Sequence, residues 1–261
     1  MKSNHESTDS ISSSPVPAAP DRHPGNPFVG LRVAITGGTS GLGLALVREL
    51  LNRGARVAFV ARRRDRVEQV GHELPDAHGI VGDVSRKEDI HPITMQIVGG
   101  LGGLDVLINN ASDLGPMPLK LLADTECEEF ERAVATNVFG PFRLTKALLG
   151  SLSASAREGR GAVVINVSSD AALNAYARWG AYGASKAALL QLSRIWDEEL
   201  SHEGVRILSI DPGDMDTPMH AAAVPDADRS TLKPAEVAAC ELGDAVAAAL
   251  LRRPIVQEVF A

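Results

Sequence analysis

The sequence predicts an α/β protein: a single doubly wound domain of the Rossmann type, with a mostly parallel sheet and helices on both faces. Two observations predict this class. Short β-branched apolar runs alternate with helical patterns of ten or more residues from Leu31 onward, which is typical of a parallel sheet with crossover helices. A glycine-rich turn joins the first apolar run directly to the first helical pattern, as at the start of a βαβ unit.

The apolar runs place the expected strands at residues 31–36, 56–60, 79–83, 105–110, 162–168 and 205–210. Gly54 and Gly204 follow amphipathic segments, where helix C-terminal caps are expected. A loop over 212–233, a helix over 234–251 and a candidate last strand over 255–260 come after these strands. Right-handed crossovers predict a ligand site at the carboxyl ends of the strands.

The composition is that of a globular chain, with 44% hydrophobic and 23% charged residues among 261. No run of about 18 apolar residues occurs, so no membrane span or membrane partner is expected. The net charge of −7 argues against a nucleic-acid partner, which needs clustered positive charge. The two cysteines are too few for a disulfide framework, which favours the reducing cytoplasm. No metal site is expected.

Residues 1–29 differ from the rest of the chain. They are rich in Ser, Pro and charge, and they show no apolar periodicity. We expect a disordered N-terminal tail over 1–29, because nothing there offsets the entropy of ordering, and one domain over 30–261. The tail lacks the apolar core of a secretory signal, and its acidic residues are unlike a transit peptide.

Directly after the first expected strand comes the segment Thr36-Gly37-Gly38-Thr39-Ser40-Gly41-Leu42-Gly43. Gly37 permits a tight turn, Gly41 lets the backbone approach a pyrophosphate, and Gly43 lets the helix pack close to the sheet. The N-terminus of the following helix presents free N–H groups and the positive end of its dipole to phosphates. A plain turn is the alternative, but the strand before and the helix after are the context that a dinucleotide site requires.

The second expected strand ends at Ala61 and is followed by Arg62 and Arg63. A site selective for NAD usually places an acidic residue there to accept a hydrogen bond from the ribose 2′-hydroxyl. An arginine at that place can pair with a 2′-phosphate instead. The sequence therefore predicts NADP(H) in preference to NAD(H), with a solvated helix start as the alternative.

Tyr182 and Lys186 stand four residues apart at the start of a long helical pattern, which puts both side chains on one helix face. A phenol normally titrates near about 10, too high for a good base at neutral pH. A lysine charge about 4 Å away offers roughly 4 kcal/mol at an effective dielectric of about 20. This energy would lower the phenol pKa by about three, into the range for acid/base catalysis.

Other polar residues are expected at the same edge of the sheet. Ser169 directly follows the strand over 162–168, thirteen residues before Tyr182, and Asn137 lies in a helical segment upstream of that strand. The run Asn109-Asn110-Ala111 ends another strand. These groups should converge beside the glycine-rich turn, because the carboxyl ends of parallel strands meet there.

Taken together, these motifs resemble the short-chain dehydrogenase/reductase family, in its compact single-domain branch, over about residues 30–235. TGGTSGLG resembles the cofactor motif TGxxxGxG, and Asn109-Asn110-Ala111 resembles the NNAG motif. Ser169 and YGASK resemble the catalytic serine and YxxxK, and Asn137 resembles the fourth catalytic member. Asp83-Val84, Pro212-Gly213 and Thr217 resemble the adenine contact, the PG motif and a threonine at the nicotinamide end.

The resemblance implies hydride transfer between NADP(H) and a carbonyl or secondary alcohol of a small molecule. Tyr182 would give or take the substrate proton, and Ser169 would hydrogen-bond the substrate oxygen. Lys186 would bind the nicotinamide ribose and lower the tyrosine pKa, and Asn137 would hold a water that leads to solvent. The implied cofactor-binding residues are Gly37, Thr39, Ser40, Gly41, Leu42, Gly43, Arg62, Arg63, Asp83, Val84, Asn110, Ala111, Tyr182, Lys186, Pro212, Gly213 and Thr217.

The chain departs from the family pattern at Ser112, which replaces the last glycine of NNAG. Serine would be strained there if the position needs positive φ, and its hydroxyl could enter the pocket. The candidate substrate-pocket residues are Ser112, Leu114, Met117, Asp170, Tyr176, Trp179, Met215 and Met219.

Long helices around 124–150 and 179–202 match the family's dimer-forming pair, and we expect a homodimer or homotetramer. Their apolar residues Phe130, Val134, Leu189 and Trp196 cannot all face one sheet. The C-terminus is shorter than in many family members, which often use a longer last strand and tail in their subunit contact.

Two other functions stay open beside the oxidoreductase. A regulator that binds NADP(H) without turnover is one, although such proteins usually lose the tyrosine or the lysine. An epimerase or dehydratase that uses bound cofactor is the other, although those enzymes carry a larger C-terminal substrate domain.

Overall fold

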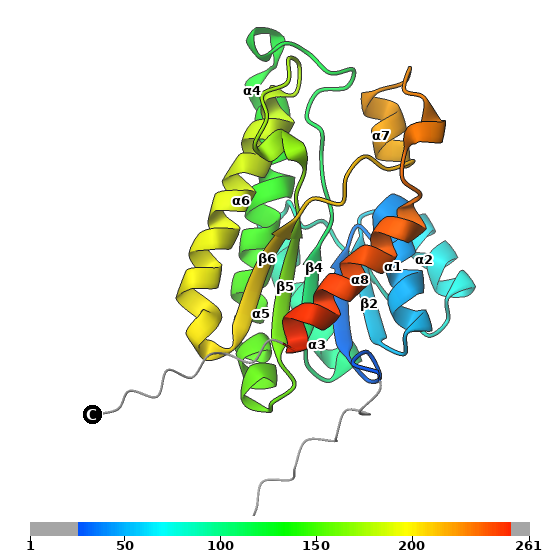
Figure 1. The fold of residues 1–261 in the computed structure, drawn as a ribbon, viewed down its shortest axis with the longest axis vertical. Helices are drawn as coiled ribbons and strands as arrows, with labels where there is room; N and C mark the ends of the chain where they lie inside the picture. The colour runs from blue at the N-terminus through cyan, green and yellow to red at the C-terminus, as the bar shows by residue number, and fades with distance from the viewer. Residues whose placement is uncertain (1–25, 252–261) are drawn as a thin grey trace, which may run out of the picture.

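The computed structural model describes residues 26–251. Its sheet has six strands: β1 (Arg32–Thr36), β2 (Arg56–Ala61), β3 (His78–Val81), β4 (Val106–Asn109), β5 (Ala162–Val167) and β6 (Val205–Ile210). Their order is β3-β2-β1-β4-β5-β6, and every pair is parallel (Figure 1). The predicted fold class, a doubly wound Rossmann-type domain, is confirmed.

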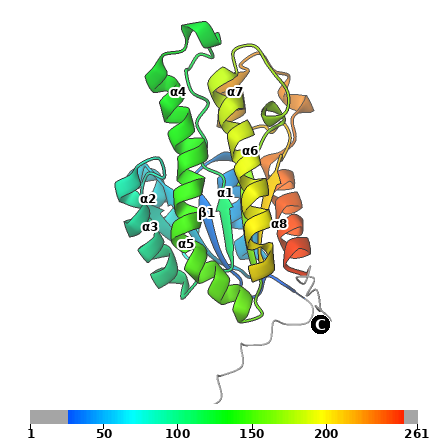
Figure 2. The same cartoon turned by 90° about the vertical axis from the view of Figure 1, so that its left-hand side faces the viewer.

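Helices cover both faces of the sheet. One face packs against α1 (Gly41–Asn52), α2 (Arg64–Glu73) and α8 (Ala235–Leu251). The other face packs against α3 (Lys87–Leu101), α5 (Gly140–Arg157) and α6 (Gly180–Leu200), which stand in front of the sheet in Figure 2. Two shorter helices, α4 (Cys127–Val134) and α7 (Pro218–Ala223), lie beyond the carboxyl ends of the strands.

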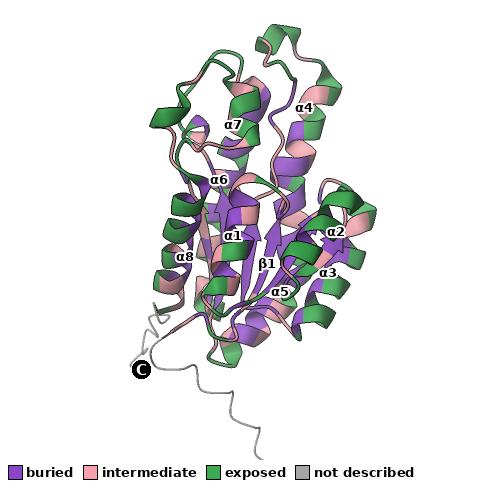
Figure 3. Cartoon of the chain, turned by 90° about the vertical axis from the view of Figure 1, so that its right-hand side faces the viewer, coloured by how far each residue is buried: buried purple, intermediate pink, exposed green. Residues whose placement is uncertain are grey.

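The strands form the buried centre of the molecule, as Figure 3 shows. All six residues of β5 are buried, because its side chains face a helical layer on either side. This burial on both faces explains why the strands read as continuous apolar runs rather than alternating ones. The strand order reverses between β1 and β4, which opens a crevice at their carboxyl ends.

The domain begins earlier than the sequence predicted. Phe28 is buried against the α1 and α8 side of the core, and the Asn26 side-chain amide donates a hydrogen bond to the Arg53 carbonyl. The expected tail over 1–29 is therefore wrong for residues 26–29, because an aromatic ring there packs on the core. The rest of that tail, and the candidate strand over 255–260, lie outside the described residues.

The expected helix over 124–150 is two helices. A π-helical turn (Ala135–Phe139) separates α4 from α5 and carries Asn137. Leu189, which we expected to contribute apolar surface outside the sheet contacts, is buried within the chain itself, and the Trp196 ring stacks on Phe142 with centroids 5.3 Å apart. In residues 26–251 no helix combines the length and apolar character needed to span a membrane.

Short helical turns complete the connections: η1 (Leu122–Asp124), η3 (Asp170–Ala172), η4 (Ser201–Glu203) and η5 (Arg229–Thr231). Gly204 ends η4 with φ of 79° and Gly54 has φ of 95°, so both expected helix-terminating glycines adopt the left-handed conformation.

Candidate active site

The glycine-rich turn joins β1 to α1 at the carboxyl edge of the sheet. Gly37 has φ of 72°, which L side chains rarely adopt. A Cβ on Gly43 would overlap the Gly37 carbonyl oxygen and the Asn110 side chain, so only glycine allows α1 to start this close to the loop. The two positions thus take the local roles that the sequence predicted for them.

The N-terminus of α1 fits a phosphate. Ser40 is its N-cap residue, but the serine side chain makes no capping hydrogen bond. The first-turn N–H groups of a helix have no intrahelical acceptor, and here they lie in the cavity wall formed by Ser40, Gly41, Leu42 and Gly43. Unpaired N–H groups and the helix dipole suit an anionic pyrophosphate.

Three arginines stand after β2, where the ribose end of a dinucleotide would lie. Arg62, Arg63 and Arg66 all line the cavity. Arg63 pairs with Asp65 at 2.6 Å, whereas Arg62 has no hydrogen bond or ion pair with any described residue. Ala61 ends β2 and offers no carboxylate. The arrangement can hold a 2′-phosphate through Arg62, and Arg66 adds a cation that the sequence analysis missed.

The NNA segment ties the end of β4 to the end of β1. The hydroxyl oxygen of Thr36 accepts hydrogen bonds from the backbone N–H groups of Asn110 and Ala111, both at 3.0 Å. The Asn110 side-chain amide donates to the Thr36 carbonyl at 2.8 Å. These bonds fix the cavity wall between the two strands where the sheet order reverses.

Asn137 is fully buried and does not line the cavity. Its amide donates to the Asp113 carbonyl and to the Ser185 hydroxyl, both at 2.8 Å. Its Oδ1 accepts from the Asp113 N–H at 2.8 Å and from the Ser112 hydroxyl at 3.2 Å. Both amide hydrogens and both oxygen lone pairs are thus used. The side chain fastens the loop after β4 to α6.

Ser112 carries no backbone strain. Among the described residues other than glycine, positive φ occurs at Arg178, so the strained conformation considered for Ser112 is absent. Ser112 lines the cavity, as expected if its hydroxyl enters the pocket, and this hydroxyl also donates a hydrogen bond to Asn137.

The proposed catalytic side chains meet at the inner end of the cavity. Tyr182 and Lys186 lie on one face of α6, and Ser169 follows β5. The Lys186 ammonium donates a hydrogen bond to the Val167 carbonyl at 2.7 Å and lies 5.5 Å from the centre of the Tyr182 ring. Two further ammonium donors remain for a ligand such as a ribose diol.

The electrostatics of this pair differ from the expectation. Burial lowers the pKa of Lys186 to about 8. Burial raises the pKa of the Tyr182 phenol above its usual range, the hydroxyls of Ser169 and Ser112 lower it, and Asp211 and Asp170 raise it further. The expected lowering of the tyrosine pKa by Lys186 is therefore wrong for this structure, because the phenol is desolvated and the ammonium bonds to a carbonyl.

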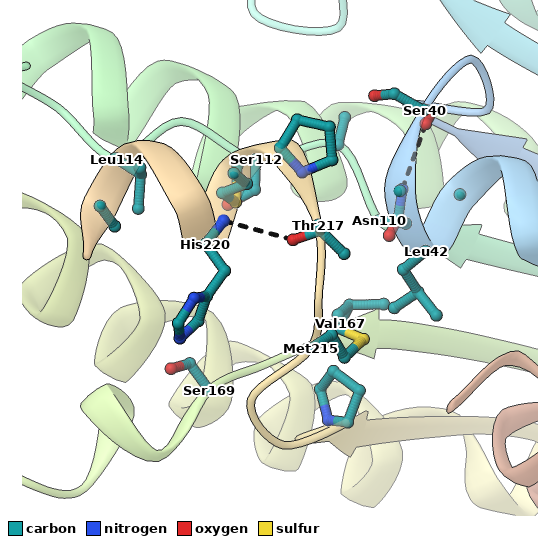
Figure 4. Close-up of a pocket in the computed structure, with 18 of the residues that line it drawn as sticks. Ser40, Leu42, Asn110, Ser112, Leu114, Val167, Ser169, Met215, Thr217 and His220 are labelled. Carbon is teal, nitrogen blue, oxygen red and sulfur yellow. Dashed lines mark hydrogen bonds between the residues drawn. The ribbon is translucent and has the colours of Figure 1, made fainter. Parts of the chain in front are cut away.

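The glycine-rich turn, the three arginines after β2 and the proposed catalytic residues other than Asn137 line one cavity of about 1310 Å³. This exceeds the roughly 300–1,000 Å³ of a typical single-ligand pocket and leaves room for a dinucleotide and a substrate. Each residue that we assigned to cofactor binding lines it. Figure 4 shows the middle of this cavity, with Thr217 and His220 of the α7 region opposite Ser169.

The substrate-pocket candidates are divided between two hollows. Met117 is 45% exposed and lines a smaller neighbouring pocket, so its placement in the main cavity is wrong. The other candidates line the main cavity: Ser112, Leu114, Asp170, Tyr176, Trp179, Met215 and Met219. Sequence reasoning missed Asp211, Asp214 and His220, which no motif marks because they enter through the fold of the loop after β6.

The reversal of strand order, the glycine loop and the Tyr182–Lys186 face together define an NAD(P)-dependent oxidoreductase of the α/β class. The chain belongs to the short-chain dehydrogenase/reductase family: the family model for short chain dehydrogenases matches residues 32–228. The chain is also 34% identical to a serine 3-dehydrogenase of Agrobacterium fabrum (strain C58), over 71% of this chain and 72% of that protein.

Solved structures share the fold. A 3-ketoacyl-(acyl-carrier-protein) reductase from Brucella melitensis, complexed with NADH, superposes with a TM-score of 0.80 at 24% identity, over 87% of this chain and 95% of that one. An alcohol dehydrogenase from Thermococcus sibiricus, complexed with 5-hydroxy-NADP, has a TM-score of 0.75 at 27% identity, over 85% and 93%.

Proposed function

We propose that the protein transfers hydride between NADP(H) and a carbonyl or secondary alcohol of a small molecule, with Tyr182 as the general acid and base. The observation that carries this proposal is the meeting of Tyr182, Ser169 and Lys186 in the cavity that the glycine loop also lines. A bound nicotinamide supplies or accepts the hydride.

The side chains of this chain handle the proton and the orientation of the substrate. In reduction the Tyr182 hydroxyl donates its proton to the oxygen that becomes the alcohol, and in oxidation the phenolate takes that proton back. The Ser169 hydroxyl holds the same oxygen. Lys186 is buried beside Tyr182 and orients the ribose hydroxyls with its free ammonium hydrogens. The raised pKa of Tyr182 keeps the phenol protonated at neutral pH, which suits the direction of reduction.

Two observations support NADP(H) over NAD(H). Arg62 lines the cavity without a partner among the described residues, and no carboxylate ends β2. A guanidinium binds a 2′-phosphate with paired, charge-assisted hydrogen bonds. Solved structures of this fold hold either cofactor, NADH in the Brucella melitensis reductase and an NADP derivative in the Thermococcus sibiricus dehydrogenase, so the proposal rests on Arg62 and the end of β2.

Assembly and location belong to the same proposal. Phe139 and Ile195 are 47% and 44% exposed on the α4–α5 and α6 side of the molecule, and they suit a symmetric interface of a homodimer or homotetramer. Light scattering at micromolar concentration tests this, and a monomer would refute it. The two cysteines are exposed and unpaired, as suits the reducing cytoplasm.

The experiment that tests the function is Tyr182→Phe, which removes the transferable proton and keeps the ring. We expect turnover of a verified substrate to fall at least about 100-fold, the lower range of acid/base contributions. NADPH binding, followed by fluorescence titration, should be largely kept. Near-normal turnover in this variant would overturn the mechanism. A regulator without turnover would instead bind NADPH but would not oxidise it with any carbonyl compound.

A further inference from the structure

The lining arginines and all lining carboxylates except Asp83 stand at opposite ends of the cavity. Three lining arginines stand at the end of β2, where we place the adenosine part of the cofactor. Three lining carboxylates, those of Asp170, Asp211 and Asp214, stand at the Tyr182 end. Asp170 and Asp211 are close enough to influence the Tyr182 phenol, and Asp214 influences Tyr176. The Lys186 ammonium is the cation at this end among the described lining residues, and it lies beneath the tyrosine.

Asp170 lies next to the Ser169 hydroxyl, the group that we propose hydrogen-bonds the reacting oxygen of the substrate. Its Oδ1 accepts a hydrogen bond from the Ser169 hydroxyl at 3.1 Å, and its Oδ2 accepts one from the Tyr176 hydroxyl at 2.6 Å. An ionised carboxylate offers about four acceptor positions, so about two remain for a ligand. The Tyr176 bond holds the carboxylate in place, and both residues line the cavity.

A buried polar atom without a partner lies across the cavity on α7. The Nδ1 atom of His220 is buried and has no hydrogen-bond partner among the described residues. Its ring extends from α7 toward the segment that carries Ser169 (Figure 4). Buried polar atoms without partners are few in folded proteins and call for an explanation. With the ring proton on Nε2, this Nδ1 atom is an acceptor, and a turn of the ring would present it to a ligand hydroxyl in the cavity.

Resting on the proposed function, we propose that Asp170, with His220 opposite, selects substrates that carry a hydroxyl or ammonium on the carbon next to the reacting one. The Ser169 Oγ and Asp170 Oδ1 atoms are 3.1 Å apart. The reacting oxygen and a donor on the adjacent carbon of a bent chain have a similar separation. The oxygen can therefore accept from the Ser169 hydroxyl, which gives up its bond to Asp170, while the donor on the adjacent carbon takes the freed Asp170 Oδ1. The substrate class is vicinal diols and amino alcohols, with their ketones.

The same charges disfavour anions. A substrate carboxylate beside the reacting carbon would meet Asp170, which is exposed at this end of the cavity, and like charges repel. A substrate without any donor would lose the contact to Asp170. One hydrogen bond to a charged group corresponds to about a 10- to 100-fold effect in kcat/KM.

The test compares four 2-propanols that differ only at carbon 1. Four 2-hexanols with the same differences at carbon 1 form a second set with a longer carbon chain. Carbon 1 carries a hydroxyl, an ammonium or a methoxy group, or is itself the carboxylate carbon as in lactate, and NADP⁺ reduction is followed. We expect kcat/KM for the diol and the amino alcohol to exceed that for the methyl ether by at least about 10-fold. We expect the carboxylate to be the poorest of the four.

Asp170→Asn is the informative variant, because the amide still accepts from Tyr176 but lacks the charge. The preference for diol over ether should fall about 10-fold, and that for the amino alcohol should fall further. Asp226→Asn is the matched control, since Asp226 is exposed and does not line the cavity, and its ratios should equal those of wild type. The wild-type ratios decide the question even if Asp170→Asn is unstable.

Equal rates on diol and ether, or a preference for the carboxylate, overturn the inference and leave hydride transfer standing. Equal loss on all four alcohols in Asp170→Asn also overturns it, because Asp170 would then only position Ser169. Absence of turnover with every compound, while NADPH still binds, overturns the proposed function as well.

Discussion

The Ser112 hydroxyl lies 3.2 Å from Oδ1 of Asn137 and donates a hydrogen bond to it, at a position where the family motif has glycine. The same hydroxyl is near enough to the Tyr182 phenol to affect its pKa. Burial raises the pKa of that phenol, and the hydroxyls of Ser169 and Ser112 offset part of the increase. Ser112 is therefore a side chain of the catalytic cluster that the glycine motif would not supply.

Ser112→Ala should separate the two directions of the reaction. Oxidation needs the phenolate, so its rate rises with pH through the phenol pKa. Loss of the hydroxyl raises that pKa, and we expect the rising limb of the profile to move to higher pH. The phenolate fraction falls as the pKa rises, so oxidation at pH 8 should slow. A displacement of the rising limb by one pH unit corresponds to a decrease of about 10-fold. Reduction at pH 7 uses the protonated phenol and should change less. The measurement is kcat/KM against pH in both directions.

Ser112→Thr is the control for this change, because it keeps the hydroxyl and should leave the pH profile near that of wild type. Equal losses in both directions for Ser112→Ala, with an unmoved profile, would mean that the serine only shapes the loop around Asn137.

The buried ammonium of Lys186 should lower the free energy of unfolding at neutral pH, although the proposed reaction needs this residue. Burial lowers its pKa to about 8, while in the unfolded chain the pKa is about 10.4. Between these values the unfolded chain binds a proton that the folded chain does not, so the free energy of unfolding rises with pH in this window. Below about pH 8 both the folded and the unfolded chain bind the proton, so the free energy of unfolding no longer changes with pH through Lys186. There the buried ammonium lowers stability by its full desolvation penalty.

Lys186→Met removes that penalty while keeping a long side chain. We expect a melting temperature a few degrees above wild type at pH 7, and a smaller difference at pH 9.5, with activity lost at both. Loss of the bond to the Val167 carbonyl adds a cost that does not vary with pH. Exposed Lys87→Met is the control and should show no pH-dependent difference. A difference that is constant with pH would refute the assignment.

The local patterns in the sequence predicted the fold because each strand is buried on both faces and each crossover helix has a marked end. They placed Gly37, Ser169, Tyr182 and Lys186 around one edge, because parallel strands end together. They did not predict the state of Tyr182. Its pKa depends on the burial of the ring and on Asp211, which reaches the pocket through the chain's path after β6.

Composition misplaced the start of the domain for a similar reason. Pro, Asn and Gly around residues 24–27 predict a tail, but whether Phe28 packs depends on the groove that it meets. Arg53 lies over the Phe28 ring, 4.9 Å from its centre, and pairs with Glu49 and Asp244. These contacts join α1 to α8, and no local pattern in the sequence encodes them.

Phe28→Ala should therefore lower stability although it lies close to the expected tail. The ring is 4% exposed, and its removal should cost about 3 kcal/mol, the lower end for a buried phenylalanine. That corresponds to a fall of roughly 10 °C in melting temperature for a domain of this size. Val29→Ala is the matched control, because Val29 is 43% exposed. Equal effects of the two changes, measured by thermal unfolding, would show that the Phe28 contact adds nothing.

Cofactor choice rests on Arg62, with Arg66 as a second cation. Charge-assisted hydrogen bonds contribute about 1.5–3 kcal/mol each, so one or two favour NADPH over NADH by roughly 10- to several-hundred-fold. Because Arg66 also lines the cavity, Arg62→Ala alone should weaken the preference only in part. Arg64→Ala is the matched control, since Arg64 is exposed and outside the cavity.

The double change Ala61→Asp with Arg62→Ala should move the preference toward NADH. The new carboxylate can accept from the ribose hydroxyls of NADH and repels the 2′-phosphate of NADPH, while the attraction from Arg62 is removed. The measurement is titration of both cofactors against wild type, the two single arginine variants and the double variant. Equal affinity of wild type for NADH and NADPH would mean that these arginines are only a solvated start of α2. The fold and the arrangement around Tyr182 do not depend on that result, because no contact of Tyr182, Ser169 or Lys186 involves the end of β2.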